Sequence, residues 1–104
     1  MISKRFLLKL IMGTALLKSS AVFAHYPVMT CEAQDQLINC EVGFSDGTKA
    51  KGKPIYLFDY DDKLLETKKA DGFSRVQFVR PDGDFYLQFD SGHEFPVEVD
   101  VGEL

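Results

Sequence analysis

Two cysteines on either side of a short turn constrain the fold of this chain more than any other feature. Cys31 and Cys40 lie in two runs that alternate apolar and polar residues, 26–33 and 37–44, joined by a turn at Asp35-Gln36. If these runs pair as an antiparallel hairpin around that turn, the register places Cys31 directly opposite Cys40. The Cβ atoms of such a pair are about 4.5–5.5 Å apart, near disulfide distance. The spacing therefore predicts a hairpin with a disulfide across it, in preference to a dithiol metal or redox site.

The first 24 residues resemble an export signal. Residues 1–24 begin with basic residues, continue through an apolar run at 6–17, and end in Val22-Phe23-Ala24, a small-x-small pattern that signal peptidase cleaves. The run is too short, and too interrupted by lysine, to span a bilayer as an anchor. Cleavage after Ala24 would make His25 the first residue of a periplasmic, secreted protein. Cleavage after Ser19-Ser20-Ala21 is the alternative, and it would leave three residues in front of the histidine.

Removing 24 residues from 104 leaves 80, which is enough for one small domain. Four of the 12 basic residues leave with the signal, whereas all 16 acidic residues stay, so the mature domain has a formal net charge of −8. This charge argues against nucleic acid as a partner, because nucleic-acid binding requires basic patches. It suits attraction of cations, although acidic surfaces more commonly serve only solubility.

The remaining pattern predicts an all-β fold. No stretch after residue 25 has helical apolar periodicity, whereas short alternating runs recur between turn residues. We predict residues 25–104 to form a small seven-stranded antiparallel β-sandwich of the immunoglobulin-like or transthyretin-like type. The predicted strands are 26–33, 37–44, 54–60, 64–69, 73–79, 85–90 and 94–101. Residues expected mostly in the core include Met29, Tyr26, Tyr56, Phe58, Phe78, Phe85 and Phe89.

The two histidines are the candidate metal ligands. As a first residue, His25 offers an α-amine and an imidazole that can chelate one ion. Pro27 has no N–H to lose, so it stops chelation from extending along the backbone amides beyond Tyr26. His93 precedes the last predicted strand, and the first and last strands of a sandwich often lie close together. The amine and the two rings would form a histidine brace, which suits Cu(II) or Ni(II) better than Ca or Mg. Asp90 and Glu94 flank His93 and could add an oxygen ligand or orient its ring. The alternative is an ordinary exposed loop histidine.

Part of the chain resembles a known domain family. The segment 43–59, GFSDGTKAKGKPIYLFD, resembles the first half of carboxypeptidase-regulatory-like domains. The part of those domains that follows is matched by Asp61-Asp62-Lys63-Leu64-Leu65, Thr67 and Ala70-Asp71-Gly72-Phe73. Together with Ala24-His25 and Gly92-His93, the chain is similar to small periplasmic accessory proteins of nickel/cobalt uptake systems, which accompany energy-coupling-factor type transporters. The resemblance implies Ni(II) or Co(II) as the bound ion, His25 and His93 as its ligands, and a membrane transporter as the partner.

These observations lead to a functional expectation. We expect a periplasmic accessory protein that captures Ni(II) or Co(II) and does not span the membrane after cleavage. A copper chaperone or sequestration protein with the same ligands is the first alternative, and a non-metal protein-interaction module is the second. We do not expect an enzyme, because the sequence contains no recognisable Ser/His/Asp order, phosphate-binding glycine loop or activated cysteine.

Overall fold

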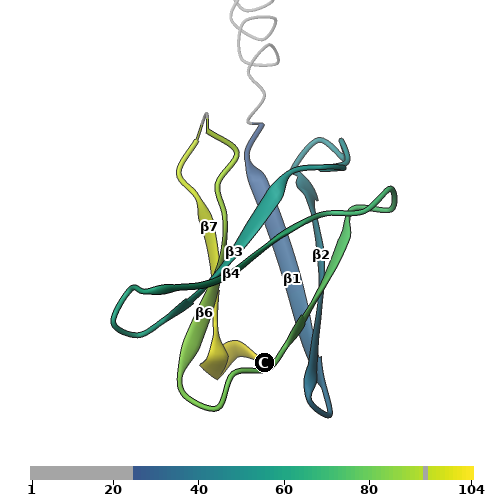
Figure 1. Ribbon diagram of the computed structural model, residues 1–104. Coiled ribbons are helices and arrows are strands. Elements are labelled where there is room, and N and C mark those ends of the chain that lie inside the picture. Colours follow the sequence, from purple (N-terminus) through teal and green to yellow (C-terminus); the bar gives the residue numbers. More distant parts are fainter. Residues whose placement is uncertain (1–24, 93) are drawn as a thin grey trace, which may run out of the picture.

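Seven antiparallel strands form two packed sheets in the computed structural model, which describes residues 25–92 and 94–104 (Figure 1). One sheet has the order β1-β2-β5 and the other the order β4-β3-β6-β7. The elements are β1 (Pro27–Gln34), β2 (Leu37–Phe44), β3 (Pro54–Asp59), β4 (Leu64–Lys69), β5 (Arg75–Val79), β6 (Phe85–Phe89), β7 (Val97–Asp100) and the 3-10 turn η1 (Val101–Glu103). The predicted seven-stranded all-β sandwich is confirmed. Within the described part of the chain, no helix is long and apolar enough to cross a membrane.

The β1–β2 hairpin has the predicted register and the predicted disulfide. Cys31 and Cys40 are paired across the two strands, with Cα atoms 4.1 Å apart, and their sulfur atoms are bonded. Asp35 in the connecting turn has a φ of 55°, a left-handed conformation that Asp tolerates better than most residues. The disulfide therefore joins two strands that the turn has already placed in register.

Removal of the disulfide should cost a large part of the stability of so small a domain. We expect the double variant Cys31→Ala/Cys40→Ala to lower the free energy of unfolding by about 2–3 kcal/mol, because the unfolded chain regains the freedom of the short loop that the disulfide closes. Urea denaturation followed by circular dichroism measures the change. Reduction of the wild-type protein serves as an independent control and should give a similar loss. A change below about 1 kcal/mol by both routes would contradict this expectation.

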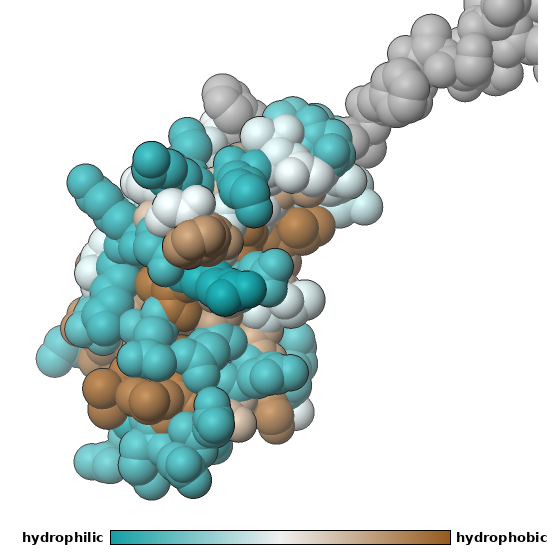
Figure 2. All heavy atoms as spheres, turned by 90° about the vertical axis from the view of Figure 1, so that its right-hand side faces the viewer, coloured by the Kyte–Doolittle hydropathy of each residue, from teal (hydrophilic) through white to brown (hydrophobic). Residues whose placement is uncertain are grey.

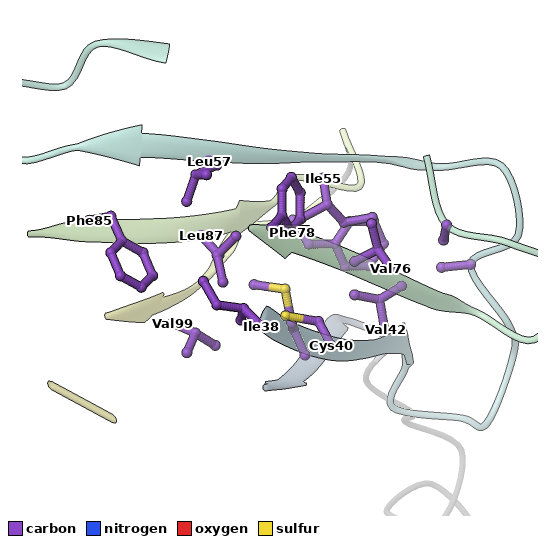
Figure 3. Close-up of a cluster of buried hydrophobic side chains, with 14 residues drawn as sticks. Ile38, Cys40, Val42, Ile55, Leu57, Val76, Phe78, Phe85, Leu87 and Val99 are labelled. Atoms are coloured by element: carbon purple, nitrogen blue, oxygen red, sulfur yellow. The ribbon is translucent and has the colours of Figure 1, made fainter. Parts of the chain in front are cut away.

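The core lies between the sheets and follows the alternation of the strands. Its largest fully buried side chains come from four strands of both sheets: Phe89 and, labelled in Figure 3, Ile38, Ile55, Phe78, Phe85 and Leu87. Met29, Phe78, Phe85 and Phe89 are buried, as expected.

Three aromatic residues expected in the core lie elsewhere. Ile55 and Leu57 occupy the inward positions of β3, so the intervening Tyr56 and the following Phe58 point outward and are only half-buried. Tyr26 precedes β1 and is 48% exposed. The prediction was wrong for these three residues because it weighted aromatic character above the period-2 alternation of the strand.

The last strand is shorter than predicted. It begins at Val97 rather than Glu94, directly after Pro96, which has no N–H to donate to a neighbouring strand. It ends at Asp100, whose side chain accepts a hydrogen bond from the N–H of Gly102 and caps the 3-10 turn. The chain between β6 and β7 therefore forms a longer connection, at the same end of the sandwich as the start of β1 (Figure 1).

Candidate functional site

His25 lies two residues before the start of β1, and its ring rests on an aromatic side chain connected to the core. The imidazole and the Phe44 ring form a T-shaped pair, with centroids 4.7 Å apart and planes at 83°. Phe44 in turn contacts the fully buried Phe89, with centroids 5.7 Å apart. The histidine side chain remains 54% exposed. One side of its ring thus packs against the sandwich, and the rest of the ring is open to solvent.

The backbone next to His25 is hydrogen-bonded to the turn after β2. The N–H of Tyr26 donates to Oγ of Ser45 at 3.0 Å, and the N–H of Ser45 donates to the carbonyl of Tyr26 at 2.9 Å. The backbone bond extends the β1–β2 ladder by one residue beyond Pro27, and the bond to the serine side chain holds the other polar group of Tyr26. The chain is therefore tied down up to the residue that follows His25, instead of fraying where the strand begins.

A carboxylate lies beside the imidazole. Nε2 of His25 is 3.8 Å from Oδ1 of Asp46, in the turn at residues 45–48. The side-chain hydrogen bond with Thr48 is the main cause that lowers the pKa of Asp46 below 3.8, followed by the bond from the backbone N–H of Thr48 and, to a lesser extent, the charge of His25. Asp46 is therefore ionised at neutral pH and holds a fixed negative charge at the Nε2 side of the ring.

The sequence analysis did not identify Asp46 or Phe44 as part of the site. The signal was nevertheless present in the hairpin register that predicted the disulfide. That register pairs Pro27 with Phe44, and continuing it by two residues on each strand places His25 across from Asp46. Asp46 is thus a neighbour of His25 through strand pairing, whereas Asp90 and Glu94 are neighbours of His93 in the sequence.

The second predicted ligand, His93, lies outside the described residues, as do residues 1–24 with the predicted cleavage site after Ala24. These remain predictions. The segment after position 93, however, can be placed: residues 94–97 and residues 26–29 line one groove between the two sheets. The connection that carries position 93 therefore adjoins the chain directly after His25.

The acidic residues that flank position 93 differ in what they contact. Oδ1 of Asp90 accepts a hydrogen bond from the N–H of Gly92 at 2.9 Å, and Gly92 has a φ of 86°, so Asp90 stabilises a bend in the connection. Asp90 and Glu94 are both exposed and border the same small depression. Among the residues that the structure describes, no three His, Cys, Asp or Glu side chains are grouped closely enough to hold a metal ion. His25 and Asp46 alone are therefore not a complete metal site.

Comparisons with known proteins identify no relative of this chain: no family model, no curated protein and no solved structure matches it. The resemblance to carboxypeptidase-regulatory-like domains and to nickel/cobalt accessory proteins consequently remains an expectation.

Proposed function

We propose that this protein binds a transition-metal ion outside the cytoplasm, capturing Ni(II) or Co(II) through His25 and His93 and delivering it to a membrane transporter. The observation that supports this proposal is the setting of His25. Its ring is supported by Phe44, faces the Asp46 carboxylate, and lies at the end of the sandwich where the β6–β7 connection adjoins β1. A first-residue histidine in this place would have its ring supported on one side, and its amine would lie at the end of the sandwich where residues 94–97 adjoin β1.

The position of Asp46 suits this chemistry. Once His25 is the first residue, its amine and Nδ1 are the two nitrogens that can close a chelate ring. The other ring nitrogen, Nε2, is the one that faces Asp46. A carboxylate on that side favours the tautomer that carries its proton on Nε2 and leaves Nδ1 free for the metal, as carboxylates commonly do for metal-bound histidines.

The same nitrogen ligands would also bind Cu(II). Affinities for divalent metals rise from Co(II) through Ni(II) to Cu(II), so the protein should bind copper more tightly than nickel in a test tube whichever ion it carries in the cell. Copper sequestration is therefore the second candidate function. The ion retained by protein isolated from cells, rather than relative affinity, distinguishes the two.

A nickel titration of the protein that begins at His25 tests the proposal. Isothermal titration calorimetry should show one Ni(II) ion per chain. We expect Asp46→Asn to weaken binding by roughly tenfold, at the lower end of the effect of removing an outer carboxylate from a metal-bound histidine, because Asp46 is exposed.

Asp61→Asn is the matched control. It removes the same charge from an exposed aspartate in the β3–β4 turn, away from His25. We expect nickel affinity to stay within about twofold, since exposed charges further away than a Debye length are largely screened. Equal effects of the two variants would show that Asp46 acts only through net charge, and the absence of any nickel binding would contradict the proposed function itself.

A further inference from the structure

An aromatic stack lies on the outer face of the four-stranded sheet. Phe58 of β3 and Tyr86 of β6 are neighbours with ring centroids 5.1 Å apart and planes at 17°, and Tyr56 lies 6.2 Å from Phe58. All three are half-buried rather than enclosed by the core. We call Tyr56, Phe58 and Tyr86 the aromatic face.

Carboxylates border the aromatic face along its β7 side. The strand register aligns two rows of residues across β4, β3, β6 and β7: Leu64, Phe58, Tyr86 and Asp100 in one, and Thr67, Tyr56, Gln88 and Glu98 in the other. Neither row contains a lysine or an arginine. Two exposed apolar side chains, Tyr60 at 52% and Leu64 at 48%, extend the surface toward the β3–β4 turn. The surface is thus apolar in its middle and acidic along one side.

Tyrosine hydroxyls hold these carboxylates in place. Tyr60 donates to Oδ1 of Asp100 at 2.7 Å, and Tyr86 donates to Oδ1 of Asp62 at 2.8 Å. These bonds raise the pKa of both tyrosines to about 12, so the hydroxyls keep their protons at neutral pH. The bond from Tyr60 also lowers the pKa of Asp100. Asp100 therefore stays ionised, and the two hydrogen bonds orient Asp62 and Asp100 beside the aromatic rings.

We propose that the aromatic face and its bordering carboxylates, Asp62, Glu98 and Asp100, bind an arginine side chain on a segment of a partner protein. A guanidinium group is planar, stacks on aromatic rings and pairs with carboxylates, whereas a lysine ammonium is a compact and strongly hydrated charge. Charge complementarity favours such a partner, because residues 25–104 hold 16 acidic and 8 basic residues. Exposed Tyr60 and Leu64 would contact apolar residues next to the arginine.

This surface is separate from the candidate metal site. Phe89, at the end of β6, is the neighbour of Phe44 and hence of His25. Tyr86 lies near the other end of the same strand. A partner bound to the aromatic face would therefore leave His25 accessible, so the two proposals do not depend on each other.

The test uses a blocked pentapeptide, Gly-Arg-Leu-Arg-Gly, and the same peptide with citrulline in place of arginine. Citrulline keeps the planar shape and loses the charge. Titration followed by NMR should give saturable shifts of the ring signals of Tyr56, Phe58 and Tyr86 and of the Leu64 methyl groups. We expect the citrulline peptide to bind at least tenfold more weakly. Absence of saturable shifts, or equal affinity of the two peptides, would overturn the proposal.

Two matched double variants distinguish this surface from general attraction to an acidic protein. Asp62→Asn/Asp100→Asn should weaken binding of the arginine peptide at least fivefold. Asparagine keeps one acceptor oxygen for each tyrosine hydroxyl, and it suits the φ of 61° at Asp62. At position 100 its amide nitrogen replaces Oδ2, so the bond from the N–H of Gly102 is lost. Glu32→Gln/Glu41→Gln removes two charges from exposed residues of β1 and β2 and should leave affinity within twofold.

An equal loss in both variants would show diffuse electrostatic attraction and overturn the proposal. The side of the molecule that carries β1 and β2 is largely hydrophilic with scattered hydrophobic patches (Figure 2). The NMR signals of residues on that side should show no saturable shifts when the arginine peptide is added. Leu64→Ser, a change at an exposed position, provides a second variant in case the aspartate changes disturb the sheet. It should weaken binding about threefold, and an unchanged affinity would count against the apolar part of the surface.

Discussion

Phe89→Ala should lower the free energy of unfolding by about 3–5 kcal/mol, the range measured for truncating buried aromatic side chains. Phe89 is fully buried, belongs to the four-stranded sheet, and contacts Phe44 of the three-stranded sheet. Its removal leaves a cavity between the layers that the surrounding side chains fill only partly. Since small domains have a total stability of roughly 5–15 kcal/mol, the variant should lose a large part of its stability and unfold at a much lower urea concentration than the wild type. Urea denaturation measures the change.

Phe95→Ala provides the control for this prediction. Phe95 lies in the connection that begins after Phe89, but it is 91% exposed. Its replacement should change the free energy of unfolding by less than about 0.5 kcal/mol, as surface substitutions usually do. Similar effects of the two substitutions would mean that the sheets do not pack around Phe89 as described. The comparison also matters for the candidate site, because Phe89 supports Phe44 and Phe44 supports the ring of His25.

His25→Ala should weaken nickel binding by at least about 100-fold in the protein that begins at residue 25, equivalent to roughly 2.7 kcal/mol or more of binding free energy. The substitution removes the ring and with it the chelate, leaving the amine as a single nitrogen ligand at this position. His93→Ala should cause a smaller loss of about 10–100-fold, because the chelate at His25 remains. Calorimetric titration with Ni(II) measures both affinities.

Acetylation of the α-amine of His25 is the sharpest control for the chelate. It keeps every side chain, including the pair of His25 and Asp46, and removes only the amine as a ligand. We expect a loss of affinity comparable to that of His25→Ala. If the acetylated protein binds nickel as tightly as the one with a free amine at His25, the terminal amine is not a ligand. If His25→Ala binds as tightly as the wild type, the candidate metal site is wrong.

The hairpin and its disulfide could be predicted because they are local. The turn at residues 35–36 and the alternation of its two strands together determine which residues are paired, and Cys31 and Cys40 follow from that register. The number and type of strands followed from the same alternation. The pairings of β2 with β5 and of β3 with β6 were not predicted, because they join segments far apart in the sequence and depend on how the two sheets pack.

In the candidate site, too, the local feature was predicted and the neighbours that depend on strand pairing were not. His25 was identified from its own chemistry and its place in the sequence. Asp46 and Phe44 were missed, because their part in the site depends on which residues lie across from His25 once the strands have paired. The aromatic face was missed for a related reason: Tyr56 and Phe58 were assigned to the core, although the residues between and beside them already filled the inward positions of β3.

Native mass spectrometry of the protein isolated from the extracytoplasmic fraction of cells is the most direct test of the central claim that this protein carries a transition-metal ion at an N-terminal histidine. The account predicts a chain that begins at His25, is two hydrogens lighter than the reduced sequence because of the disulfide between Cys31 and Cys40, and retains one Ni(II) or Co(II) ion. Retention of copper would favour the alternative function with the same ligands. A chain that begins elsewhere, or one that retains no transition metal even after nickel and copper are offered, would contradict the account.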